Sequence, residues 1–206
     1  MRSLVKYIFL TLAAALIGGA AYETYAVIVA RQTTKQLFSK YETATDNGAR
    51  PPSALSPEKL EILVKVQDPN FWSHGGVDWR APLATTVTQS IVKKLYFKKF
   101  GPGIEKIEQT LVAYFAVGPL ASKNAQLAAF IDMNGFDALS WRWFGKPLDA
   151  LEGDDYLALI ATNNTTKFAP GTKENAERVA RIKRYLAGAC ERRDLADVWL
   201  DRCAPS

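Results

Sequence analysis

The sequence predicts an all-α protein, and three observations lead to this fold class. Apolar residues recur at helical spacing in several segments, Pro and Gly separate these segments, and no segment alternates with a two-residue period over the length of a strand. With 206 residues, 48% of them hydrophobic, the chain is long enough for one globular domain and a short appendage.

The appendage is an apolar segment at the N-terminus, residues 1–30. Arg2 and Lys6 precede an uncharged run over residues 7–22, and apolar residues resume after Glu23. A spanning helix needs about 20 apolar residues, so this segment is long enough for an uncleaved transmembrane anchor with Glu23 near one interface. A cleaved signal peptide is the alternative, because small residues at 18–21 follow the run as a cleavage site would. The basic residues keep the N-terminus cytoplasmic, so both interpretations place residues 31–206 outside.

A juxtamembrane linker is predicted over residues 31–56 and a globular domain over residues 57–206. Residues 31–49 are polar with scattered apolar positions and could continue the anchor helix, whereas Arg-Pro-Pro-Ser at 50–53 breaks the chain. Ser56 and Pro57 are typical of a helix start, and that helix runs to Gln67. Further helices are predicted over 85–97 and 104–117, after Ser122, and over 148–161 and 174–186.

The net charge and the cysteine content of the chain limit which ligands, cross-links and metal sites it can have. A net charge of +5 suits an anionic lipid or a diphosphate, and an exported chain does not meet nucleic acid. Cys190 and Cys203 lie close together in the sequence and can pair in an oxidising compartment, where they would fix the tail. With a single His and no acidic or thiol cluster, we expect no metal site built by the protein alone.

A dense polar cluster, QDPNFWSHGGVD, occupies residues 67–78 and resembles the first motif of the peptidoglycan glycosyltransferases of family 51. This family comprises the transglycosylase domain of penicillin-binding proteins and the monofunctional biosynthetic peptidoglycan transglycosylases. Five of the six motif positions agree, namely Asp68, Phe71, His74, Gly76 and Asp78. The sixth is Gln67, which stands where the family has its catalytic Glu. An amide offers no carboxylate to accept a proton.

Two further clusters extend the resemblance. Thr86, Thr88, Gln89 and Lys93 match the family's second motif, whereas Leu83 and Ala84 replace its glycines. Their hydroxyl and amide groups suit sugar and phosphate oxygens, and Lys93 supplies a charge for phosphate.

Residues 105–109 resemble the third motif, with Lys106 at a basic position and Glu108 as the second glutamate. A one-residue shift would place Gln109 there instead. Further motifs of the family follow in the same order along this chain, so the similarity spans about residues 57–187.

This resemblance implies a lysozyme-like helical domain, on the periplasmic side of a bacterial inner membrane, that polymerises glycan strands from a lipid-linked disaccharide precursor. The partners would be this precursor, nascent glycan, membrane lipid and other cell-wall synthases, and a divalent cation such as Mg²⁺ or Mn²⁺ could assist the diphosphate.

Gln67 leaves the activity open. It fits a natural pseudoenzyme, a laboratory inactivation, or an enzyme in which Asp68 or Glu108 takes the proton. The alternative function is a catalytically inactive, substrate-binding or scaffolding partner of an active cell-wall synthase. A glycan hydrolase of the same fold would need two carboxylates.

Simpler roles stand beside these assignments. His74 could be a loop histidine that bonds its neighbours and organises the site, and the lysine-rich run could be a solvated face. We assign Lys93 and Lys106 to phosphate, and Lys94, Lys98 and Lys99 to the surface or to lipid headgroups.

Overall fold

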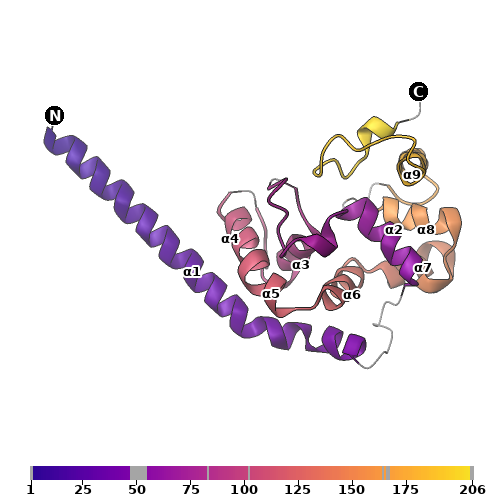
Figure 1. Ribbon diagram of the computed structural model, residues 1–206, viewed down its shortest axis with the longest axis horizontal. Coiled ribbons are helices and arrows are strands. Elements are labelled where there is room, and N and C mark those ends of the chain that lie inside the picture. Colours follow the sequence, from indigo (N-terminus) through magenta and orange to yellow (C-terminus); the bar gives the residue numbers. More distant parts are fainter. Residues whose placement is uncertain are drawn as a thin grey trace.

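The computed structural model describes residues 2–46, 55–82, 84–101, 103–163, 165 and 168–204. Within these ranges the chain forms helices and loops and no strand, which confirms the all-α class. Figure 1 shows one long helix, α1, beside a globular body made by the rest of the chain. The breaker at 50–53, Leu83 and Pro102 lie outside the described residues.

Helix α1 (Arg2–Asp46) is continuous, and at 1.5 Å per residue it is about 68 Å long. Leu4, Phe9 and Leu16 in its first part are exposed, and the helix is long and apolar enough to cross a membrane. It continues through residues 31–46, so much of the segment predicted as a linker is helical. The expected boundary at residue 30 therefore falls inside one helix.

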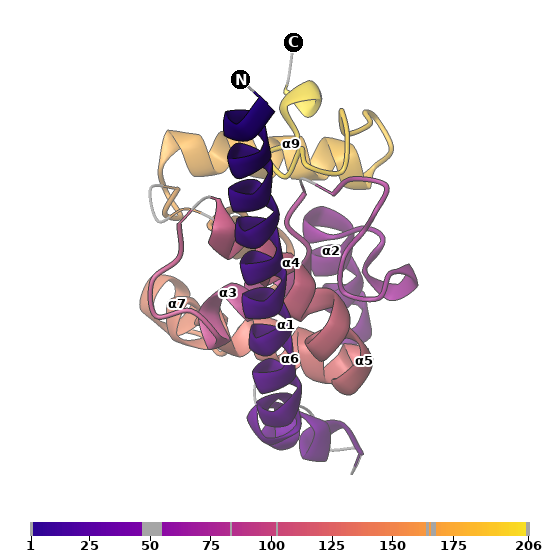
Figure 2. The same ribbon diagram turned by 90° about the vertical axis from the view of Figure 1, so that its left-hand side faces the viewer.

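The second half of α1 belongs to the core of the body. Ala30, Thr34, Phe38 and Tyr41 recur at helical spacing and are buried. Helix α1 packs against α4 (Ile104–Val112), residues 113–117 and α6 (Lys123–Met133), and Figure 2 shows it in front of α4 and α6. The Thr34 and Tyr96 hydroxyls are 2.7 Å apart. The apolar first part of α1 and the body are therefore joined by packed helix.

The helices of the body follow the predicted segments closely, with shifted ends. They are α2 (Pro57–Gln67), α3 (Val87–Leu95), α4 (Ile104–Val112), α5 (Gly118–Leu120), α6 (Lys123–Met133), α7 (Phe136–Phe144), α8 (Gly153–Ala161) and α9 (Lys173–Leu186). A π-helical turn, Ala113–Val117, follows α4. Short 3-10 turns occur at Phe71–Ser73, Leu148–Ala150 and Asp201–Cys203.

Two differences from the predicted elements have local causes. The helix expected over 148–161 is divided, because Leu151 and Glu152 are extended and α8 begins only at Gly153. Helix α7 was not predicted from the sequence, and it lies between two glycines, Gly135 and Gly145, both in the left-handed region.

Side-chain caps fix where four helices begin. The hydroxyls of Ser56, Thr86, Ser122 and Thr172 each accept a backbone N–H three residues later. Thr86 and Gln89 form a full capping box at α3. The predicted caps Ser56 and Ser122 are confirmed. After α9 the chain turns back, and Cys190 and Cys203 form a disulfide, which settles the pairing left open by the sequence.

Gly76 and Gly118 allow the loop before α3 to lie directly against the end of α4. Gly76 has φ of +109°, and a Cβ atom there would lie 2.3 Å from the Ala113 carbonyl oxygen. A Cβ atom on Gly118 would lie 2.0 Å from the Gly75 carbonyl oxygen. No larger residue fits this contact without backbone movement.

We expect Phe38→Ala to lower the free energy of unfolding of the purified full-length protein in detergent by about 3–5 kcal/mol, because it removes a fully buried ring. Phe9→Ala, in the exposed first part of α1, is the matched control and should leave the unfolding midpoint unchanged. Equal effects of the two variants in urea titrations would show that residues 31–46 do not stabilise the body.

Lowering the pH should destabilise the loop before α3, because Asp78 becomes protonated. Hydrogen bonds from Arg80 and from Asn70 lower the pKa of this buried carboxyl to about 2. Because the folded pKa lies below the unfolded value, the carboxylate stabilises the fold above about pH 4, and this contribution is lost as the pH falls toward 2. Asp78→Asn should make the free energy of unfolding, measured by urea titration, depend less on pH in this window. Asp154→Asn, at an exposed site, should keep the wild-type slope.

Candidate functional site

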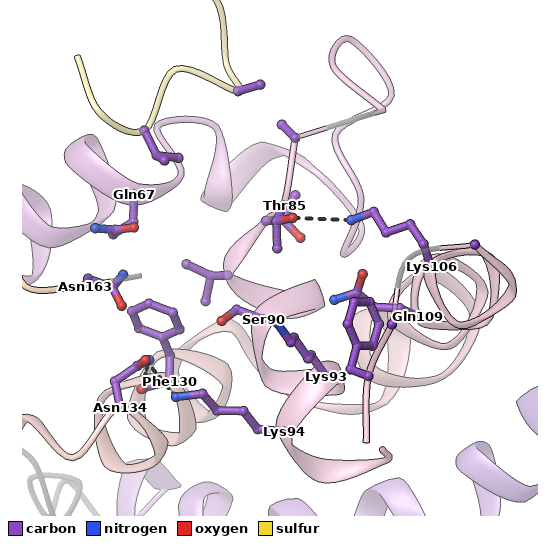
Figure 3. Close-up of a pocket in the computed structure, with 18 residues that line it drawn as sticks. Gln67, Thr85, Ser90, Lys93, Lys94, Lys106, Gln109, Phe130, Asn134 and Asn163 are labelled. Carbon is purple, nitrogen blue, oxygen red and sulfur yellow. Dashed lines mark hydrogen bonds between the residues drawn. The ribbon is translucent and has the colours of Figure 1, made fainter. Parts of the chain in front are cut away.

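A pocket of about 830 Å³ lies among α2, α3, α4, α6 and the C-terminal loop (Figure 3). It is lined by Gln67, Ala84, Thr85, Thr86, Val87, Ser90, Lys93, Lys94, Phe100, Gly101, Gly103, Lys106, Gln109, Phe130, Asn134, Asn163, Ala196 and Val198. A pocket of this size accommodates a ligand of several hundred daltons.

The pocket has two chemically different ends, which Figure 3 shows on opposite sides of Thr85 and Ser90. We call the side with Gln67, Asn134 and Asn163 the amide end, where Lys94 bonds Asn134. The side with Lys93 and Lys106, together with Gln109, is the lysine end. Hydroxyl groups lie between them.

Lysines give the pocket a positive charge. Lys106 Nζ lies 3.3 Å from the Thr85 hydroxyl, and Lys93 Nζ lies 4.9 Å from the centre of the Phe100 ring. Partial burial and the charge of Lys93 lower the pKa of Lys106. Lys94 donates to the Met133 carbonyl and to Asn134 Oδ1, both at 2.8 Å.

No carboxylate balances these charges within the described part of the pocket. Its lining contains neither Asp nor Glu, and none of the three lysines forms an ion pair there. Bringing an anion into the pocket would relieve the mutual repulsion of the lysines. The charge pattern therefore favours an anionic ligand.

Three buried amides carry unused hydrogen-bonding atoms. Gln67, Gln109 and Asn163 are 7%, 1% and 5% exposed. Among the described residues, Gln67 Nε2, Gln109 Oε1 and Asn163 Nδ2 have no hydrogen-bond partner. Gln109 is held by its other amide atom, which donates to the Gln89 carbonyl at 2.7 Å. Since buried polar groups are nearly always paired, these atoms indicate a polar ligand at both ends.

Asp68 and His74 lie outside the pocket and organise its wall. His74 Nε2 is 3.0 and 3.1 Å from the two Asp68 carboxylate oxygens, and the Gly76 N–H donates to His74 Nδ1 at 3.1 Å. Asp68 also accepts the Val87 N–H at 3.0 Å. Asp68 thus connects the end of α2, the following loop and the start of α3. This geometry matches the simpler role of His74 as a loop histidine bonded to its neighbours.

The residues of the second motif are divided between pocket and core. Thr86 lines the pocket and donates to the Gly76 carbonyl at 2.7 Å. Thr88 is fully buried and bonds Gln126 at 2.6 Å. Gln89 is also buried, and its Nε2 donates to the Thr110 hydroxyl at 3.1 Å. Thr88 and Gln89 therefore bond neighbouring helices, and the Thr86 hydroxyl is engaged by Gly76 and Gln89, whereas Lys93 is available to a ligand.

The two candidates for the second glutamate of the third motif point in different directions from α4. Glu108, our choice from the sequence, faces α1, where it accepts a hydrogen bond from the Tyr22 hydroxyl at 3.3 Å, and it does not line the pocket. Gln109, the residue that a one-residue shift would select, lines the pocket. The pocket thus has an amide at Gln67, where the resemblance places the catalytic glutamate, and a second amide at Gln109.

Other lining residues gave weaker signals or none in the sequence. Lys94, assigned to the surface, lines the pocket beside Lys93. Asn134 and Asn163 each follow the end of a helix, and only the tertiary structure brings them to Gln67.

The lining does not fit a divalent cation. Mg²⁺ and Mn²⁺ favour carboxylate oxygens, whereas the described lining offers amide and hydroxyl oxygens beside three positive charges. Groups of three or more acidic, His or Cys side chains suited to a metal are also absent from the described residues.

No protein-family model matches the chain, and a comparison with curated proteins gives no match.

We expect inorganic diphosphate to raise the thermal unfolding midpoint of the full-length protein, because it binds the lysine end of the folded state. Replacing Lys93 and Lys106 together by Ala should weaken diphosphate binding by about tenfold or more, measured by calorimetry at low salt. The matched control replaces Lys98 and Lys99, which are exposed and outside the lining. If the control variant binds diphosphate as weakly as the test variant does, diphosphate affinity depends only on the overall charge of the protein.

Proposed function

We propose that this protein is a membrane-anchored relative of the family 51 glycosyltransferases that binds a lipid-linked peptidoglycan precursor and does not polymerise it. The observation that carries the proposal is the pocket lining, which combines three lysines with unpaired amides and, among its described residues, no carboxylate. Such a lining suits a diphosphate joined to a sugar.

The missing carboxylate argues against turnover. Glycosyl transfer to a hydroxyl group needs a base to take the proton as the bond forms. Gln67, at the position of the family's catalytic glutamate, and Gln109 can hydrogen-bond a sugar but cannot take its proton. Asp68 is engaged with His74, and Glu108 faces α1. The geometry therefore supports binding over catalysis.

The direction of the pocket along α1 fits a ligand held in a membrane. Near the lysine end, Glu108 contacts Tyr22. Near the amide end, Asp132 pairs with Lys40 at 3.0 Å, two residues before Asn134. Eighteen helical residues separate Tyr22 from Lys40, which is about 27 Å along α1.

The lysine end is thus closer to the membrane-spanning part of α1 than the amide end is. A lipid-linked sugar has the same order, with its diphosphate beside the lipid and its saccharide farther out. Binding in this direction pairs the diphosphate with lysines and the saccharide with amides, each end of the ligand meeting groups of complementary chemistry.

The test uses the full-length protein in detergent with labelled lipid-linked disaccharide, scoring both binding and glycan-strand formation. We expect the wild type to bind without forming polymer, and the Lys93→Ala, Lys106→Ala double variant to lose most of the binding. Glu108→Gln should bind as the wild type does, because this side chain lies outside the pocket.

Carboxylates restored at the amide positions provide the sharper comparison. Polymer from the double variant Gln67→Glu, Gln109→Glu, and none from the wild type, would show a substrate site that lacks only its carboxylates. Polymer from the wild type that disappears in Asp68→Asn or Glu108→Gln would instead show an enzyme with a different base. Absence of binding by the wild type would refute the proposed ligand.

A further inference from the structure

The C-terminal loop, residues 188–203, forms a wall of the pocket although it follows the segment that resembles the glycosyltransferases. It begins after α9 and is closed by the Cys190–Cys203 disulfide. Ala196 and Val198 from this loop line the pocket. Both are small apolar residues, so this wall offers no side-chain hydrogen bond to a sugar.

Hydrogen bonds place the loop against the end of α2. Arg192 Nη2 donates to the carbonyl oxygens of Lys65 and Val66, at 3.1 and 2.9 Å, immediately before Gln67. Within the loop, the buried carboxylate of Asp197 accepts the N–H groups of Arg193 and Asp201 at 3.1 and 3.2 Å. The loop is therefore held in shape and in position beside the amide end.

Arg178 of α9 fixes two lining residues at once. Its side chain is 2% exposed, and its guanidinium group donates to the Asn163 carbonyl at 2.8 Å and to the Val198 carbonyl at 3.1 Å. The group also lies 4.2 Å from the centre of the Trp199 ring. Burial lowers the pKa of Arg178 to about 10, so it stays charged at neutral pH. Asn163 and the loop wall are thus held as one unit.

We infer that the C-terminal loop ends the saccharide site and restricts the ligand to a compact headgroup, a lipid diphosphate carrying a short saccharide and not an extended glycan. The inference rests on the proposed function. It follows from the position of the wall, because Ala196 and Val198 line the same pocket as Gln67 and Asn163, and hydrogen bonds from Arg178 and Arg192 hold the loop beside Asn163 and the end of α2. The loop therefore takes up space that a longer saccharide would need at this end. A pocket of about 830 Å³ is suited to a ligand of compact size.

The first experiment measures the affinity of the full-length protein in detergent for polyprenyl diphosphate and for the same lipid carrying a disaccharide. Ala196→Trp places a large side chain at the wall. We expect it to weaken binding of the disaccharide form about tenfold, to the level of the bare lipid, whose affinity should not change. Ala204→Trp, an exposed position just after the disulfide and outside the lining, should bind both ligands as the wild type does.

The second experiment removes the disulfide that closes the C-terminal loop, by replacing Cys190 and Cys203 with Ser. It also measures binding of a lipid-linked glycan of several disaccharide units. The wild type should bind the disaccharide form more tightly than the long form, and the double variant should reduce this preference. Unfolding profiles identify any variant that does not fold.

The outcomes separate the two proposals. If the wild type binds neither the bare lipid nor the disaccharide form, the proposed function fails, and this inference fails with it. If the wild type binds the disaccharide form but prefers the long glycan, or if Ala196→Trp binds as the wild type does, only the inference about the loop is overturned.

Discussion

The carboxylate of Asp68 is the constraint on which the rest of the site depends. It accepts hydrogen bonds from the His74 ring and from the first N–H of α3, so one buried group joins the end of α2 to the start of α3. Gln67 precedes it, and Thr86 caps the helix that it anchors. A buried acceptor with several donors tolerates little displacement, which gives the pocket a rigid base.

Much of the fold follows from local sequence signals. Ser56 and Ser122 mark helix starts through hydrogen bonds that form within a single turn, and such short-range chemistry is visible in the sequence. The extent of α1 was less visible, because the packing of Phe38 and Tyr41 into the core and the contact with α6, rather than composition, account for helix in residues 31–46. The division before α8 likewise depends on extended backbone at Leu151 and Glu152.

The site was predicted less completely than the fold. Gln67, Lys93 and Lys106 were singled out by the resemblance, each within a short motif of its own. Asn163 could not be found in this way, because it enters the pocket through a hydrogen bond of its backbone to Arg178 in a later helix. The sequence could not tell that Gln109 lines the pocket and Glu108 does not, because this depends on the orientation of α4 against α1, and adjacent residues of a helix point about 100° apart.

The unbroken helix α1 has a mechanical consequence. A flexible tether would let the body explore a hemisphere above the bilayer, at heights set by the statistics of a random coil. If α1 spans a membrane, as we propose, a rod packed into the body instead limits the range of heights and orientations that the pocket can adopt. Encounters with a membrane-bound ligand would then be a two-dimensional search between partly aligned molecules, and less orientational entropy would be lost when they meet.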